Sequence, residues 1–368
     1  MAYTTIDDPS AYFQTALYTG TGSGFSVTNS GNSNLQPDWV WVKDRSTTND
    51  HKITDSSRLA SGKPSITLES NTTAVEFDDA DPMSTDSFDT DGFTIGTNGN
   101  YNTDGNTYVA WQWKCNGGTT ASVSVGTNDG NTTTACVRQV NTTAGFAIIT
   151  YTADSNGEQF LEHGLGVAPT FLLVKDRGNE ESWIVGHEGN LGTTAFHNYL
   201  ELNTNTSSQT ENRWLNTAPT STAINIGPNN SVGGNGRNYV CYAFAPIQGY
   251  SKFGKYTGNG LADGPYIHTG FKPAWVMVKK SSADHSWYMQ YGSTNIDSGD
   301  QGSNPVKNSL QANSNSADAS ENSMDFLSNG FKLRTTGNGH NTDTGTYIYM
   351  AFAEKPFVSS EGVPATAR

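Results

Sequence analysis

The sequence has little charge and no long apolar run. Only 15% of its 368 residues are Asp, Glu, Lys or Arg. No stretch approaches the roughly 18 apolar residues of a membrane helix. The opening residues, MAYTTIDDPS, lack the basic flank and the apolar core of a signal peptide. We therefore expect no membrane insertion and a protein that is made and folded in a cytoplasm.

Basic side chains and cysteines are also scarce. The 21 Lys and Arg residues stand against 35 Asp and Glu, which gives a formal net charge of -14. Such a molecule repels the phosphates of nucleic acids, so we expect no nucleic acid partner. Cys115, Cys136 and Cys241 have neither CxxC spacing nor the density of a disulfide scaffold. We expect them to be reduced and structural.

The sequence also lacks the common catalytic and metal-binding motifs. It contains no HxH, HExxH or GxSxG arrangement, and its carboxylates gather in turns rather than as a pair suited to glycoside hydrolysis. Asp89 with Asp91, and Asn102 with Asp104, resemble fragments of calcium loops but lack the further carboxylate that such a loop needs. We therefore expect no enzyme activity, no metal site and no cofactor.

Residues that favour turns and strands are abundant instead. The chain has 39 glycines and is rich in Asn, Thr and Ser. Gly and Asn tolerate the positive φ of tight turns, whereas Thr, Tyr, Val and Trp suit a pleated surface. No window of a dozen residues shows a sustained helical pattern of apolar residues, and we expect no more than a short helical turn around NYLEL at 198–202. The composition predicts an all-β protein.

One strand pattern occurs three times, as QPDWVWVKDR at 36–45, APTFLLVKDR at 168–177 and KPAWVMVKKS at 272–281. Each is preceded by a strand that ends in Tyr-Thr, and each is followed by a strand that begins with Tyr. The distance from the Pro to the later Tyr is 71, 70 and 74 residues. The structural anchors of the repeats are Pro37, Trp39 and Tyr108, then Pro169, Phe171 and Tyr239, then Pro273, Trp275 and Tyr347.

Spacing kept so closely over unlike sequence indicates one domain used three times. The repeats are much longer than the roughly 20 to 50 residues of solenoid units, so we expect each repeat to close its own core as a separate bead. The expected divisions are an N-terminal arm (1–10), repeat 1 (11–116), a linker (117–144), repeat 2 (145–247), repeat 3 (248–357) and a C-terminal tail (358–368). The linker piece ASVSVG alternates and could add an edge strand.

The Pro-led strand is apolar on both faces. In the first copy Trp39 and Trp41 lie on one face, and Val40 and Val42 lie on the other. A strand of this kind sits centrally in a sheet that is covered on both sides, as in a sandwich. The aromatic anchor is therefore expected to be a core residue rather than a ligand platform.

Three other tryptophans lie beside loops rich in Asn, Gly and Asp, namely Trp183, Trp214 and Trp287. An aromatic ring next to amide side chains suits a saccharide, which has hydroxyls and an apolar face. Glycan contact by these loops is one interpretation of the pattern. Packing or contact between subunits is the alternative.

The chain resembles a domain repeated in virion proteins of tailed bacteriophages, particularly those of marine bacteria and cyanobacteria. The resemblance rests on LYTGTGS with PDWVWVKDRS, TTAGFAIITYT with HGLGVAPTFLLVKDRG, GYSKFGKYTGNGLADGPYIHTGFKPAWVMVKK, DFLSNGFKLR and GTYIYMAFAEKPF. It covers most of the chain. It implies three consecutive jelly-roll-like antiparallel β-sandwiches of the concanavalin/SPRY type, and it supplies no catalytic residue.

The resemblance also implies a place of work on the virion. We expect a tail fibre or tail-attached adhesion component, with other virion proteins and a host-surface glycan as partners. We also expect a homo-oligomer, with a trimer favoured, both from the resemblance and because the apolar content is too rich for isolated beads. The arm of residues 1–10 is the expected anchor, because it is short, polar at first and aromatic beyond its end. Capsid decoration, or a purely structural tail protein without a ligand, is the alternative.

Overall fold

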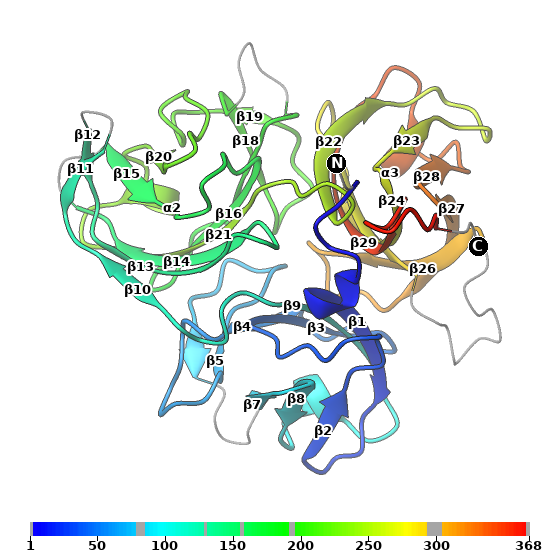
Figure 1. Cartoon of the computed structure of the whole chain (residues 1–368), viewed down its shortest axis with the longest axis horizontal. Coiled ribbons are helices and arrows are strands. Elements are labelled where there is room, and N and C mark those ends of the chain that lie inside the picture. Colours follow the sequence, from blue (N-terminus) through cyan, green and yellow to red (C-terminus); the bar gives the residue numbers. More distant parts are fainter. Residues whose placement is uncertain are drawn as a thin grey trace.

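The computed structural model describes residues 3–78, 85–128, 131–154, 158–190, 196–292 and 304–365. Almost all regular structure in these ranges is antiparallel β-sheet, which confirms the expected all-β class. Three lobes, one for each repeat, surround a common centre (Figure 1). In the described part of the chain, no helix is long and apolar enough to cross a membrane.

Repeat 1 consists of two packed sheets. The sheet of order β1-β9-β3-β4 buries Val40 and Val42 against Phe93 and Ile95 of the sheet β2-β8-β7. A short pair, β5 and β6, completes the lobe. The elements are η1 (Pro9–Ala11), β1 (Phe13–Thr19), β2 (Phe25–Thr28), β3 (Trp39–Asp44), β4 (Lys52–Asp55), β5 (Ile66–Thr67), β6 (Phe77–Asp78), β7 (Thr85–Asp89), β8 (Gly92–Ile95), α1 (Gly99–Asn102) and β9 (Thr107–Trp113).

Repeat 2 has an eight-stranded sheet of order β10-β13-β14-β21-β16-β17-β18-β19 and a four-stranded sheet of order β11-β12-β15-β20. The elements are β10 (Ala121–Val123), β11 (Gly126–Asn128), β12 (Asn131–Thr133), β13 (Cys136–Asn141), β14 (Phe146–Thr152), β15 (Gln159–Glu162), β16 (Phe171–Asp176), β17 (Ile184–His187), β18 (Asn198–Glu201), β19 (Gln209–Thr210), β20 (Ala223–Ile226), α2 (Asn230–Gly233) and β21 (Asn238–Phe244).

The segment 117–144, expected as a linker, contributes strands to both sheets of repeat 2. Strand β13 pairs with β14 along its length, and β10 then pairs with β13 at the end of the sheet. The alternating ASVSVG piece is thus an edge strand, as its pattern predicts. The segment belongs to the sandwich rather than to a spacer between domains.

Repeat 3 is built from one eight-stranded sheet of order β22-β29-β24-β25-β26-β27-β28-β23. The sheet curls, so that Val276 and Val278 of its centre share a core with Phe331 and Leu333 of a later strand (Figure 1). The elements are β22 (Ser251–Thr257), β23 (Tyr266–His268), β24 (Phe271–Lys280), β25 (Trp287–Tyr291), β26 (Val306–Gln311), β27 (Ala319–Leu327), β28 (Gly330–Leu333), α3 (Asn338–Asn341) and β29 (Thr346–Pro356).

The repeats share one core, so the expected separate beads are wrong. The face that carries Trp39 in repeat 1 turns to the centre of the molecule, where it meets the equivalent faces of repeats 2 and 3. Trp39 stacks on Tyr242 of repeat 2 with ring centroids 4.7 Å apart, and Trp113 lies edge-on to Trp275 of repeat 3 at 5.9 Å. The opposite face of each sheet packs inside its own repeat. The Pro-led strand is therefore covered on both sides, as predicted, but by different partners.

The N-terminal arm packs on its own chain instead of extending away from it. Ile6 is buried in the shared core. The Tyr3 hydroxyl donates to the carbonyl of Gly270 at 2.7 Å, and the Thr4 hydroxyl donates to the carbonyl of Gln248 at 2.8 Å. Both acceptors belong to repeat 3. The described part of the arm thus acts as a clasp across the first and last repeats.

The helical turn expected at 198–202 is wrong, because Asn198–Glu201 form strand β18. Leu200 and Tyr199 are buried there against the sheet, so tertiary packing overrides the local pattern. The described α-helical turns, α1 to α3, lie instead in the Asn/Gly-rich loops before the last strand of each repeat. In α1 and α2 an Asn side chain, Asn98 or Asn229, caps the first turn.

Candidate functional site

The three tryptophans expected near saccharide loops are all buried. Trp183, Trp214 and Trp287 are 0%, 1% and 1% exposed. A ring that is fully covered by protein cannot stack on a sugar from solvent. The alternative interpretation, packing, describes these residues.

Two of these indoles join neighbouring repeats. Nε1 of Trp183 in repeat 2 donates to the carbonyl of Glu69 in repeat 1 at 2.7 Å. Nε1 of Trp287 in repeat 3 donates to the carbonyl of Glu201 in repeat 2 at 2.8 Å. The donors occupy the same place in their repeats, eight residues after Lys175 and Lys279. Of the two interpretations that the sequence left open for Trp183 and Trp287, packing is the one that these contacts support.

His51 takes the corresponding place in repeat 1 and closes the ring. Its Nε2 lies 3.1 Å from the carbonyl of Gln311 in repeat 3, while its Nδ1 accepts from Nε1 of Trp41 at 2.8 Å. Nε2 must therefore carry the proton. Burial lowers the pKa of His51 to about 3, with the Lys43 charge acting in the same direction, so the imidazole is neutral. The repeats thus contact one another head to tail, and the third contact returns to the first repeat.

A second set of three equivalent bonds runs along the same boundaries. In each case a backbone N–H of one repeat donates to a backbone carbonyl of the next repeat. The acceptor residue lies two positions after Lys43, Lys175 or Lys279. The pairs are Glu76 to Arg177 at 2.9 Å, Ser208 to Ser281 at 3.0 Å and Asp318 to Arg45 at 2.8 Å. Among the described residues, two of these boundaries add an ion pair, Arg177 with Glu76 at 2.8 Å and Arg45 with Asp318 at 3.1 Å. The ring closes through the backbone itself.

The tyrosine anchors of the sequence hold the short helices in place. Tyr108 stacks on Tyr18, Tyr239 on Tyr151 and Tyr347 on Tyr256, with ring centroids 5.0, 5.1 and 4.9 Å apart. The hydroxyl of each later tyrosine donates to the first carbonyl of the helix that precedes it: Gly99, Asn230 or Asn338. Their recurrence therefore reflects architecture rather than ligand contact.

The next-to-last residue of each Pro-led strand is a buried lysine, namely Lys43, Lys175 or Lys279. The ammonium groups donate to backbone carbonyls; that of Lys175 bonds to Asp176, Asn179 and, across the boundary, Thr73. Burial lowers the pKa of all three to about 8. These hydrogen bonds hold the turn that follows each Pro-led strand, next to the boundary with the neighbouring repeat.

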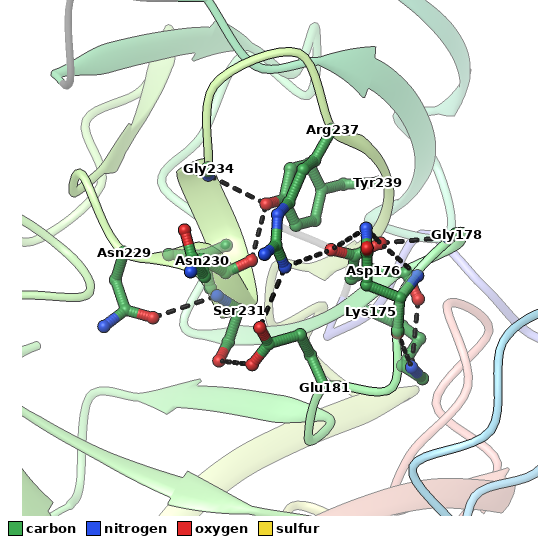
Figure 2. Close-up of polar contacts among 12 residues, drawn as sticks. Lys175, Asp176, Gly178, Glu181, Asn229, Asn230, Ser231, Gly234, Arg237 and Tyr239 are labelled. Carbon is green, nitrogen blue, oxygen red and sulfur yellow. Dashed lines mark hydrogen bonds and ion pairs between the residues drawn. The ribbon is translucent and has the colours of Figure 1, made fainter.

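In repeat 2 this turn carries a dense polar cluster (Figure 2). Buried Asp176 accepts from the N–H of Gly178 at 2.9 Å and from Arg237 at 3.1 Å. The same guanidinium reaches Glu181 at 2.8 Å, and the other oxygen of Glu181 accepts from the Ser231 hydroxyl at 2.9 Å. The network joins the turn to helix α2. Its carboxylates are taken up by internal partners.

Repeat 1 satisfies the corresponding carboxylate without a cation. Asp44 accepts hydrogen bonds from the side chains of Ser46, Thr47, Asn49 and Asn106. Burial works to raise the pKa of Asp44, but these bonds outweigh it and the pKa is lowered. The Asp44 carboxylate therefore stabilises the loop that follows β3.

In repeat 3 the same region is open. A cavity of about 340 Å³ lies between β25, β27 and helix α3, and His285, Tyr288, Glu321 and Ser323 contribute to its lining. Its lining includes His285 and Gly339, which take the sequence positions of Glu181 and Ser231 in the cluster of Figure 2. The sequence hypothesis missed this cavity. Aligning repeat 3 with repeat 2 residue by residue would have pointed to it.

The suspected calcium fragments are turn chemistry. Asp89 accepts from the hydroxyls of Ser87 and Thr94, and Asp91 accepts from the N–H of Leu35. Within the ranges that the structure describes, no three His, Cys, Asp or Glu side chains gather closely enough to hold a metal ion.

The three cysteines, Cys115, Cys136 and Cys241, are free and buried, which agrees with the structural role expected for them. Burial raises the pKa of each thiol. A thiol that is buried and protonated is a poor nucleophile.

Comparison with known proteins gives a family without an assigned role. No curated protein and no solved structure matches the chain. One family matches residues 8–356, a single span that includes all three repeats and the shared core between them. The chain belongs to this family, which is described as a domain of unknown function (DUF7483).

Proposed function

We propose that the chain is a structural protein of a tailed-bacteriophage virion, a tail fibre or tail-attached adhesion component that meets the host surface. The observation that carries the proposal is the closed ring of three repeats around one aromatic core. A ring of this kind is a rigid head with loops around its rim, which suits display on a particle. The assignment to a phage comes from the sequence resemblance. On the same basis, each repeat is proposed to be a jelly-roll-like sandwich.

The threefold arrangement inside one chain bears on the expected trimer. That expectation rested partly on more apolar residues than isolated beads could bury, and the shared core accounts for them within a single chain. A homo-oligomer on the virion therefore rests on the resemblance alone. Light scattering of the purified protein at micromolar concentration tests it, and a monomer under these conditions counts against the oligomer.

The role itself is tested by immunogold labelling of intact purified virions with antibody against repeat 3. Gold at the fibre tips or the distal tail is the expected result. Gold spread over the head would favour capsid decoration. Virions without label, from a preparation in which mass spectrometry also fails to find the chain, would remove the virion proposal.

The proposal assigns no catalysis to the chain. If it is correct, purified protein incubated with host envelope polysaccharide releases no reducing sugar. Release above that of a heat-denatured control would instead indicate a depolymerase.

A further inference from the structure

Two charged residues of the cluster in repeat 2 have neutral counterparts in repeat 3. His285 lies six residues after Lys279, as Glu181 lies six residues after Lys175. Gly345 lies two residues before Tyr347, in the place that Arg237 has before Tyr239. The Glu181–Arg237 ion pair that fills repeat 2 in Figure 2 therefore has no counterpart in repeat 3.

A second charged pair is lost in the same region. In repeat 2 the carbonyl of Arg213 accepts from the N–H of Gly227, and in repeat 3 the carbonyl of Ser323 accepts from Arg334 in the same way. This identifies Ser323 as the counterpart of Arg213. Arg213 pairs with Glu211 at 3.1 Å and lies over the ring of Tyr199 at 4.6 Å, so its side chain fills the space. A serine there leaves the space empty.

The substitution leaves polar groups in the cavity without internal partners. Ser323 is 2% exposed, and its hydroxyl has no hydrogen-bond partner in the part of the chain that the structure describes. Glu321, the counterpart of Glu211, has only a long bond of 3.4 Å from the Ser309 hydroxyl and no ion pair among the described residues. A buried hydroxyl without a partner is unfavourable, because it has lost its hydrogen bonds to water. Ser323 lines the cavity, so a bound group could satisfy its hydroxyl.

An aromatic wall stands beside these polar groups. The ring of Tyr288 lies against the imidazole of His340, with ring centroids 4.5 Å apart. A Cβ on Gly339 would come within 2.4 Å of the Tyr288 ring, so glycine is required for this close approach. Gly337 and Asn338, which also line the cavity, are exposed, so it opens to solvent on the α3 side.

The charge of the lining favours a neutral ligand over an anionic one. The described lining residues include no Lys or Arg, and Glu321 is the one carboxylate among them. Burial lowers the pKa of His340 to about 3, so its imidazole is neutral and adds no positive charge. The carboxylate of Glu321, the hydroxyl of Ser323 and the amide of Asn338 suit a ligand with several neutral hydroxyls. The ring of Tyr288 suits the apolar face of such a ligand. The volume falls at the low end of the roughly 300 to 1,000 Å³ of small-molecule sites.

We propose that the cavity between β25, β27 and α3 of repeat 3 binds a neutral saccharide residue, with Glu321 and Ser323 hydrogen-bonding its hydroxyls and Tyr288 contacting its ring. This assignment rests on the proposed attachment role and names the class of its ligand. It also moves the saccharide hypothesis from the three buried tryptophans to a cavity that opens to solvent.

The test is saturation-transfer NMR on the full chain, with methyl glycosides of neutral hexoses and N-acetylhexosamines as probes, and N-acetylneuraminic acid and inorganic phosphate as anionic probes. Saturable binding of at least one neutral probe at millimolar concentration is expected. Absence of any neutral binder, or binding of the anionic probes alone, would overturn the assignment.

Variants locate the site. Ser323→Arg introduces the side chain that repeat 2 has at this position and should weaken binding at least tenfold, about 1.4 kcal/mol. Ser320→Arg is the matched control, because it makes the same change on an exposed position of the same strand and should leave binding unchanged. Glu321→Gln keeps the shape, so it tests the carboxylate if Ser323→Arg fails to fold. Equal affinity of Glu321→Gln and the unchanged chain would refute the role of Glu321.

These measurements need no virion, so their failure can be told apart from failure of the proposed role. Gold on the tail with no saccharide binding removes the cavity assignment alone. Saccharide binding together with no label on virions would support the cavity as a saccharide site and contradict the proposed role on the virion.

Discussion

At the scale of single residues, several buried polar side chains form hydrogen bonds across the boundaries between repeats. The neutral imidazole of His51 and the indoles of Trp183 and Trp287 each donate across a repeat boundary. The acceptors are backbone carbonyls, which constrain the donor's position but not the identity of the residue that supplies the carbonyl. A sequence alone therefore shows the donors as conspicuous aromatic residues without showing what they bind.

The boundary bond of Trp183 can be tested with a matched pair of substitutions. Trp183→Phe should lower the free energy of unfolding more than Trp214→Phe does, by about 1 to 2 kcal/mol. The reason is that only Trp183→Phe removes a hydrogen bond and leaves the Glu69 carbonyl without this partner. Both indoles are buried in repeat 2, and Nε1 of Trp214 has no partner among the described residues. Urea denaturation of the two variants gives the difference. Equal losses would show that the bond adds nothing beyond packing.

The buried lysines give a pH dependence on the alkaline side. Their pKa is about 8 in the folded protein and about 10.4 in an unfolded chain. Between these values the unfolded chain holds more protons, so the free energy of unfolding rises with pH, by up to about 1.4 kcal/mol per pH unit for each lysine. Below pH 8 both states are protonated and the gain is absent.

Lys175→Met should therefore reduce the slope of unfolding free energy against pH between 8 and 10, whatever it does to the stability at pH 7. Lys255→Met, at an exposed position, serves as the control and should keep the slope. The measurement is a urea titration at several pH values. An unchanged slope in Lys175→Met would mean that this ammonium stays protonated throughout the range.

At the scale of elements, the strands could be predicted from the sequence and the helical turns could not. Trp39 to Val42 alternates apolar side chains on two faces, which requires cover on both, and β3 has it. The piece NYLEL has no such signature, and Leu200 lies in a strand because the neighbouring strand β17 pairs with it. The turns α1 and α2 depend on caps by Asn98 and Asn229, and asparagine is so common in this chain that a single one predicts little.

The N-terminal clasp is an element whose expected role changes most. An arm that served only as an anchor would not be needed for folding, but Ile6 lies in the shared core. Ile6→Ala should cost about 2 to 4 kcal/mol of unfolding free energy, as for other large-to-small changes in a core. Thr5→Ala, one residue away and exposed, should cost little. Equal, small effects of the two in thermal unfolding would restore the arm to its expected role as a free anchor.

At the scale of the whole molecule, the threefold repetition is visible in the sequence but its closure is not. The spacing of the anchors shows that one structural unit occurs three times. Whether the face of Trp39 is covered by a second sheet of its own repeat, by another repeat or by another chain depends on contacts between residues more than 200 positions apart, such as Trp39 with Tyr242. The cavity of repeat 3 is hidden for a related reason, because Ser323 is informative only when it is compared with Arg213.

The shared core predicts that the three repeats unfold together. Trp39→Ala removes a ring that contacts repeat 2 and should cost about 3 to 5 kcal/mol. Because one core links all repeats, hydrogen exchange should accelerate in β24 of repeat 3 as much as in β3, where the substitution lies. Leu59→Ala, an exposed change in repeat 1, should leave both strands protected. Faster exchange confined to repeat 1 would mean that the sandwiches are independent after all, since only separate cores allow one repeat to open while its neighbours remain closed.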